Sequence, residues 1–172
     1  MVVLDTNVII DHLRLENKQA SSLLTRAVQQ HQKETLAISI LTIQELYAGR
    51  STQDTQKEQH LLATISPLRI LPYNYEVAKL AGEIARSLDN PIGLADAAIA
   101  ATTILSGGTL LTANNKDFSG IKGLTLNSLP IQEANTSQAN EGLTTLANLG
   151  IRGGPSDLAS NLDNYLYGDG KN

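Results

Sequence analysis

Short apolar runs alternate with stretches of helical periodicity along most of this chain. The runs are three to six residues long and rich in aliphatic and β-branched residues, which predicts strands. They lie at 2–4, 35–40, 68–71, 109–112 and 124–126. The stretches between them predict helices at 8–15, 18–32, 41–50, 58–65, 75–88 and 94–105. Such an alternation is typical of an α/β protein in which helices cover both faces of a parallel sheet.

Two segments between these elements are polar, and we expect them to be loops or short turns. They are 51–57 and 114–118.

The pattern changes near residue 132, which divides the chain into a body and a tail. Residues 1–131 form the predicted α/β domain, and 132–142 are small and polar, as in a linker. Residues 143–172 contain short apolar patches separated by glycines. The spacing of Leu158, Leu162, Tyr165 and Leu166 predicts a short amphipathic helix in the tail.

Composition narrows the class of protein. The chain of 172 residues has no Cys and three scattered His, so neither a disulfide nor a zinc site is expected. No apolar run reaches the roughly 18–20 residues of a membrane span. Strand residues begin at Val2, so we expect no signal peptide and a cytoplasmic protein.

Charge is unevenly distributed along the chain. Residues 1–132 carry 11 Lys and Arg against 12 Asp and Glu, whereas residues 133–172 carry two against five. A near-neutral body with an acidic tail is not a nucleic-acid binder by bulk charge. Any contact with a nucleic acid would need local cations or a metal ion that screens the phosphates.

Four acids are notable for their positions. Asp5 ends the first predicted strand, Glu45 lies in the helix directly after the second, Asp96 lies near the start of the helix at 94–105, and Asp117 follows the fourth strand. Because ligands of open α/β sheets bind outside the carboxyl ends of the strands, these acids are predicted to meet at that edge. Asp96 lies in a largely apolar helix, where an unpaired carboxylate would be costly or would stay protonated.

Carboxylates gathered in one place need a cation, and Mg²⁺ or Mn²⁺ prefers such oxygen ligands. A centre of this kind suits phosphodiester hydrolysis. Thr6, Asn7, Thr112 and Asn114 are the candidate residues that hold the carboxylates in place.

Each acid also has a simpler interpretation. Asp5 could cap the following helix, Glu45 could be a solvated helix residue, and Asp96 could be favoured by the helix dipole. Asp117 could be an ordinary turn acid.

Four segments resemble the PIN-domain family, and in particular the VapC-type toxins of bacterial type II toxin–antitoxin systems. They are LDTN at 4–7, IQELYAG at 43–49, GLADAAIAA at 93–101 and LTANNKDF at 111–118. The resemblance implies a three-layer α/β/α sandwich with a central parallel sheet, and a ribonuclease that depends on Mg²⁺ or Mn²⁺. The family's acids correspond to Asp5, Glu45, Asp96 and Asp117, and its Ser/Thr corresponds to Thr6. It also implies a homodimer.

The chain departs from the family pattern in having few charges around the site. Arg50, Lys116 and Lys122 are the nearby cations that could contact phosphate.

The tail at about 143–168 resembles the C-terminal segment of the antitoxins that inhibit such toxins. The resemblance implies that Arg152 enters the acidic site, where a guanidinium can bind two carboxylate oxygens and keeps its charge. The chain would then be a toxin joined to an antitoxin-like segment. The simpler interpretation is a C-terminal extension with Arg152 on its surface.

Two other functions remain open from the sequence. A Mg²⁺-dependent phosphatase or phospho-acceptor domain also has an Asp at the end of its first strand, but it needs a second Asp where this chain has Asn7. A catalytically silent PIN-like binding module would show no nuclease activity even without the tail.

Overall fold

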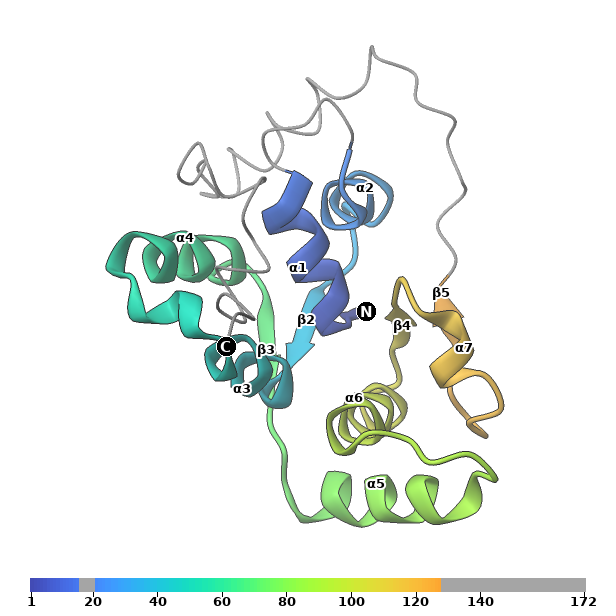
Figure 1. Ribbon diagram of the computed structural model, residues 1–172. Coiled ribbons are helices and arrows are strands. Elements are labelled where there is room, and N and C mark those ends of the chain that lie inside the picture. The colour runs from blue at the N-terminus through green and yellow to red at the C-terminus, as the bar shows by residue number, and fades with distance from the viewer. Residues whose placement is uncertain (16–20, 128–172) are drawn as a thin grey trace.

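The computed structural model of the protein describes residues 1–15 and 21–127 (Figure 1). The predicted linker at 132–142 and the predicted tail at 143–172 lie outside these residues. The same is true of the residues singled out in the tail, which are Arg152, Leu158, Leu162, Tyr165 and Leu166.

A five-stranded parallel sheet forms the centre of the domain, which confirms the predicted fold class. Its order is β3-β2-β1-β4-β5. The strands are β1 (Val2–Leu4), β2 (Leu36–Ser39), β3 (Arg69–Leu71), β4 (Thr109–Leu111) and β5 (Leu126–Asn127). In the register, Val3 pairs with Ala37 on one side and with Leu110 on the other. All strands therefore end at the same edge.

Helices cover both faces of this sheet, as Figure 1 shows. The helices are α1 (Thr6–Leu15), α2 (Leu23–Gln30), α3 (Ile40–Ala48), α4 (Thr55–Ile65), α5 (Tyr75–Ser87), α6 (Leu94–Leu105) and α7 (Asn115–Phe118). Val2 and Leu4 pack into the core beneath α1, α2 and α4, whereas Val3 packs into the core beneath α5 and α6. This alternation within β1 is what a strand buried on both faces requires.

The middle of helix α6 is fully buried, and most of its side chains are small. Residues Ala97–Thr103 are all buried, and alanines let the helix approach its neighbours closely. The hydroxyls of Thr102 and Thr103 donate to the carbonyls of Ala98 and Ile99 at 2.7 and 2.8 Å. These bonds satisfy polar groups that would otherwise be costly in the core.

The structure differs from the prediction mainly at element boundaries. Helix α1 begins at Thr6 rather than residue 8, and α7 forms one helical turn where a loop or turn was predicted. The predicted loop at 51–57 was wrong, because it contains a 3₁₀ turn, η1 (Arg50–Gln53), and the first turn of α4. Asp54 caps that helix by accepting from the backbone N–H groups of Gln56 and Lys57.

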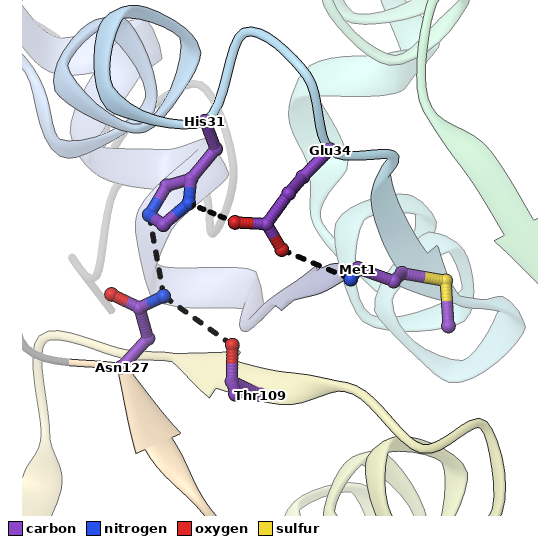
Figure 2. Close-up of polar contacts among 5 residues, drawn as sticks. All are labelled: Met1, His31, Glu34, Thr109 and Asn127. Carbon is purple, nitrogen blue, oxygen red and sulfur yellow. Dashed lines mark hydrogen bonds and ion pairs between the residues drawn. The ribbon is translucent and has the colours of Figure 1, made fainter.

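A polar network lies at the beginnings of β1 and β4 and reaches Asn127 at the end of β5 (Figure 2). Glu34 accepts from the amino group of Met1 at 3.0 Å and lies 2.7 Å from Nδ1 of His31. The amide nitrogen of Asn127 lies 3.3 Å from Nε2 of His31 and donates to the hydroxyl of Thr109, also at 3.3 Å. The network links the loop after α2 to β1, β4 and β5.

None of the helices in the described part of the chain has the length and apolarity needed to cross a membrane.

Candidate acidic site

Asp5 lies at the end of β1, immediately before the first residue of α1, and its side chain is buried. Its backbone N–H donates to the carbonyl of Leu111 in β4. Its carboxylate accepts from the backbone N–H of Thr6 at 2.7 Å, from Nδ2 of Asn7 at 2.6 Å and from the hydroxyl of Thr112 at 2.7 Å. Three donors from two elements therefore fix its position.

Thr112 joins Asp5 to the loop that leads to α7. Besides donating to Asp5, its Oγ1 accepts from Nδ2 of Asn7 at 3.1 Å and from the backbone N–H of Asn114 at 3.0 Å. The side chain of Asn114 donates in turn to Asp117. A continuous chain of hydrogen bonds thus connects two of the candidate acids.

Glu45 is brought to the same place by α3, which follows β2 directly. The hydroxyl of Thr6 donates to Oε2 of Glu45. Thr6 therefore holds two acids, since its backbone N–H binds Asp5 and its hydroxyl binds Glu45. Its β-branched side chain restricts the rotamer that makes this possible.

Asp96 lies in the first turn of α6, and its carboxylate has no hydrogen bond to a described residue. Gly93, which precedes the helix, allows the carboxylate to lie against the backbone. A Cβ at Gly93 would lie 3.0 Å from Oδ2 of Asp96. Asp96 and Asp117 line one cleft together with Lys116.

Burial and mutual repulsion raise the pKa values of three of these acids. Burial is the largest cause for Asp5 and Glu45, and a smaller rise comes from Glu45 acting on Asp5 and from Asp96 acting on Glu45. The pKa of Asp96 is raised by burial first, then by Asp5 and then by Asp117. The four acids thus share one electrostatic environment. Within the described ranges, none of the three acids with a raised pKa, Asp5, Glu45 and Asp96, forms an ion pair with Lys or Arg.

The arrangement fits a hard cation by its donor chemistry, since every candidate ligand is an oxygen. In this conformation, however, no three acidic or histidine side chains among residues 1–15 and 21–127 are placed to hold one metal ion. The two observations agree for Mg²⁺, which is commonly bound through one or two carboxylates and keeps several waters. One or two of the candidate acids Asp5, Glu45, Asp96 and Asp117 would then bind the ion directly.

The three predicted phosphate-contacting cations differ in what the structure describes. Lys116 lies in the wall of the cleft beside Asp96 and Asp117. Lys122 is exposed in the turn before β5. The side chain of Arg50 lies outside the described part of the structure.

Sequence reasoning missed the roles of Gly93 and Ala113. The backbone N–H of Ala113 donates to Oδ1 of Asn7 at 3.0 Å, which holds the amide that binds Asp5. A backbone donor carries no residue-type signal. Gly93 could have been found as a glycine three residues before an acid at a helix start.

Comparison with known proteins gives consistent matches over the described domain. Residues 2–124 match the family profile of the PIN domain. The chain is 30% identical over 129 residues to the ribonuclease VapC2 of Rickettsia felis, an alignment that covers 72% of this chain and 94% of that protein.

Two solved structures show the same architecture. One is VapBC2 of Rickettsia felis bound to a DNA fragment from its promoter, with a TM-score of 0.62 and 28% identity, covering 76% of this chain and 100% of that chain. The other is VapBC-1 of nontypeable Haemophilus influenzae, with a TM-score of 0.61 and 25% identity, covering 74% of this chain and 98% of that chain.

Proposed function

Because this chain belongs to the PIN-domain family, we propose that it is a VapC-type endoribonuclease toxin of a toxin–antitoxin system. We propose further that Asp5, Glu45, Asp96 and Asp117 hold Mg²⁺ or Mn²⁺ for phosphodiester hydrolysis. The observation that carries this proposal is that Asp5 after β1, Glu45 of α3 and Asp96 of α6 are buried or half-buried and raise one another's pKa values, with no described ion pair to offset the rise.

A bound divalent ion would supply Lewis-acid stabilisation of the phosphodiester transition state and lower the pKa of the attacking water. The protein's own contribution is to fix the donors. Asp5 is held by Thr6, Asn7 and Thr112, so its oxygens need no reorganisation when the ion binds. Thr6 orients Glu45 in the same way.

Asp96 has a different role in this proposal. Neither oxygen of its carboxylate is used by a described hydrogen bond, so both can bind the ion or accept a proton from the attacking water. Lys116, beside Asp96 in the cleft, would contact a phosphate of the RNA.

Family membership supports one of the proposed partners, an antitoxin. Matching solved structures are VapBC complexes, which supports an antitoxin as a partner of this chain. We further propose that the chain forms a homodimer, and that Arg152 of its own tail blocks the acidic site in the manner of an antitoxin.

The test compares RNA cleavage by the full chain with cleavage by residues 1–132, each with Mg²⁺, with Mn²⁺ and with EDTA. We expect metal-dependent cleavage that increases on truncation and disappears in Asp96→Asn. Equal cleavage by both forms would refute inhibition by the tail. No cleavage by either form would favour a silent binding module, and trapping of an aspartyl phosphate on Asp5 would favour the phospho-acceptor function.

A further inference from the structure

A cleft of about 560 Å³ adjoins the acid cluster on the side of α7. The end of α5, the loop between α5 and α6, and the turn after α7 form its walls. Asp96 and Asp117 belong both to the acid cluster and to the wall of the cleft. Anything bound in the cleft would therefore lie beside a phosphodiester held at the acids.

Three polar side chains in this wall have unused hydrogen-bonding groups. Asp89 and Asn90 lie in the loop between α5 and α6, and Lys116 lies on α7. All three are exposed, and none forms a side-chain hydrogen bond or an ion pair with another described residue. Their donors and acceptors are available to a ligand.

The charge and shape of the cleft indicate the chemistry of that ligand. The described residues that line the cleft carry three carboxylates, from Asp89, Asp96 and Asp117, and a single ammonium group, from Lys116. Away from Lys116, such a wall disfavours a phosphate and favours a neutral group rich in hydrogen-bond donors. Its volume falls within the range of about 300–1,000 Å³ that is usual for sites of small ligands.

A nucleobase has these properties, and the cleft would recognise it by hydrogen bonds. No aromatic side chain is among the described residues that line the cleft, so stacking on a ring cannot supply the binding energy there. Bases of single-stranded RNA are otherwise read along their Watson–Crick edges. A carboxylate pairs with two adjacent donors, and only guanine presents N1–H beside an exocyclic amino group on that edge.

We propose that this cleft binds the base next to the scissile phosphodiester of single-stranded RNA, and that Asp89 selects guanine at that position. The proposal rests on the proposed ribonuclease function. Adenine and cytosine place a ring acceptor beside their amino group, which would repel the Asp89 carboxylate, and uracil offers a single donor between two acceptors. Lys116, which also lines the cleft, would contact a phosphate of the RNA.

The first test sequences the ends produced when the chain, with Mn²⁺, cleaves a pool of single-stranded RNAs of random sequence. We expect guanine beside the cut to be enriched about tenfold, the discrimination typical of a good bidentate pair. Asp89→Asn should bring the four bases to nearly equal frequency. Glu83→Gln, which removes an exposed charge of α5 outside the cleft, should keep the guanine preference. Cleavage without guanine enrichment, or enrichment that survives Asp89→Asn, would overturn the proposal.

A second test does not depend on catalysis. Neutral nucleosides are titrated into the full chain while the amide NMR signals of Asn90 and Ser119, which line the cleft, are followed. Guanosine should bind about tenfold more tightly than uridine, and Asp89→Asn should remove that difference. If the chain cleaves no RNA, the ribonuclease function is refuted, and this titration alone decides whether the cleft binds a nucleobase. Equal binding of the nucleosides, or no shift at these residues, would then refute base recognition there.

Discussion

Replacing Asp96 with Asn measures how far repulsion among the carboxylates destabilises the metal-free fold, separately from what the acids contribute to metal binding. Asp96 is the acid best suited to this substitution, because its carboxylate makes no described hydrogen bond that Asn would break. At Asp5, by contrast, an Asn amide would turn its nitrogen toward the donors of Thr6, or of Asn7 and Thr112.

The expected change in the free energy of unfolding follows from repulsion between carboxylates. Burial raises the pKa of Asp96 most, and the charges of Asp5 and then Asp117 raise it further. Two like charges as close as about 4 Å repel by about 1 kcal/mol in bulk water and by about 4 kcal/mol at the effective dielectric constant of about 20 near a protein surface, which sets an upper limit. Asp96 is partly exposed, so solvent and salt reduce the expected gain to about 0.5–1 kcal/mol. Asp96→Asn should therefore be the more stable protein in EDTA at neutral pH.

The pH dependence has a definite sign. A carboxyl group whose pKa is raised by folding stabilises the fold at low pH, and this contribution is lost as the pH rises through the raised pKa. Burial raises the pKa of Asp5, of Glu45 and of Asp96, so the metal-free chain should lose stability from about pH 4 upward on account of these groups. The stability of metal-free Asp96→Asn should fall less than that of the wild type over the same pH range.

Bound magnesium should make the wild type more stable than Asp96→Asn. An ion at ten times its dissociation constant adds about 1.4 kcal/mol to the wild type, and the variant, with one ligand fewer, should gain less. Urea unfolding followed by circular dichroism, with EDTA and with saturating MgCl₂, measures both effects, and Glu83→Gln is the control for loss of an exposed charge. Lower stability of Asp96→Asn than of the wild type in EDTA would contradict repulsion among the carboxylates. Equal stabilisation of both proteins by magnesium would contradict a role of Asp96 in binding the ion.

Three further changes test other contacts of the structure. Thr6→Val removes the hydroxyl that donates to Glu45 and should lower kcat by about 10–100-fold, whereas Thr6→Ser should retain most activity; equal rates would contradict the role of this bond. Gly93→Ala places a Cβ 3.0 Å from Oδ2 of Asp96 and should lower cleavage by ~10-fold or more with little change in Tm, and full activity would show that Asp96 tolerates displacement. The hydrogen bond to His31, and then the bond to the Met1 amino group, lower the pKa of Glu34, so its contribution to stability exists above its ordinary pKa and is lost as the pH falls through the lowered value. Glu34→Gln should be less stable than the wild type in urea at neutral pH and equally stable in strong acid, and a difference that persists in acid would contradict this sign.

The sheet and its functional edge could be predicted because they depend on local signals. The apolar run before Asp5 and the small buried residues around Asp96 indicate a strand and a buried helix without any knowledge of the rest. Parallel strands end at a common edge, so placing the acids after strands also placed them near one another.

The contacts that hold the acids could not be predicted in the same way. The bond from Thr112 to Asp5 joins residues 107 positions apart and exists only because Val3 pairs with Leu110 in the sheet. The bridge formed by Thr6 depends on how α3 crosses the start of α1, which no periodicity encodes. The first turn of α4 was missed for a simpler reason, since Asp54 is a strong N-cap signal inside a polar stretch that was interpreted as a loop.

Anomalous diffraction from Mn²⁺ in crystals of the RNA-cleaving protein tests directly whether the four acids hold the metal. We predict an ion within about 2.1–2.3 Å of a carboxylate oxygen of Asp5 and of at least one other acid among Glu45, Asp96 and Asp117. An active protein whose manganese lies elsewhere, with no ion among these four side chains, would contradict this prediction.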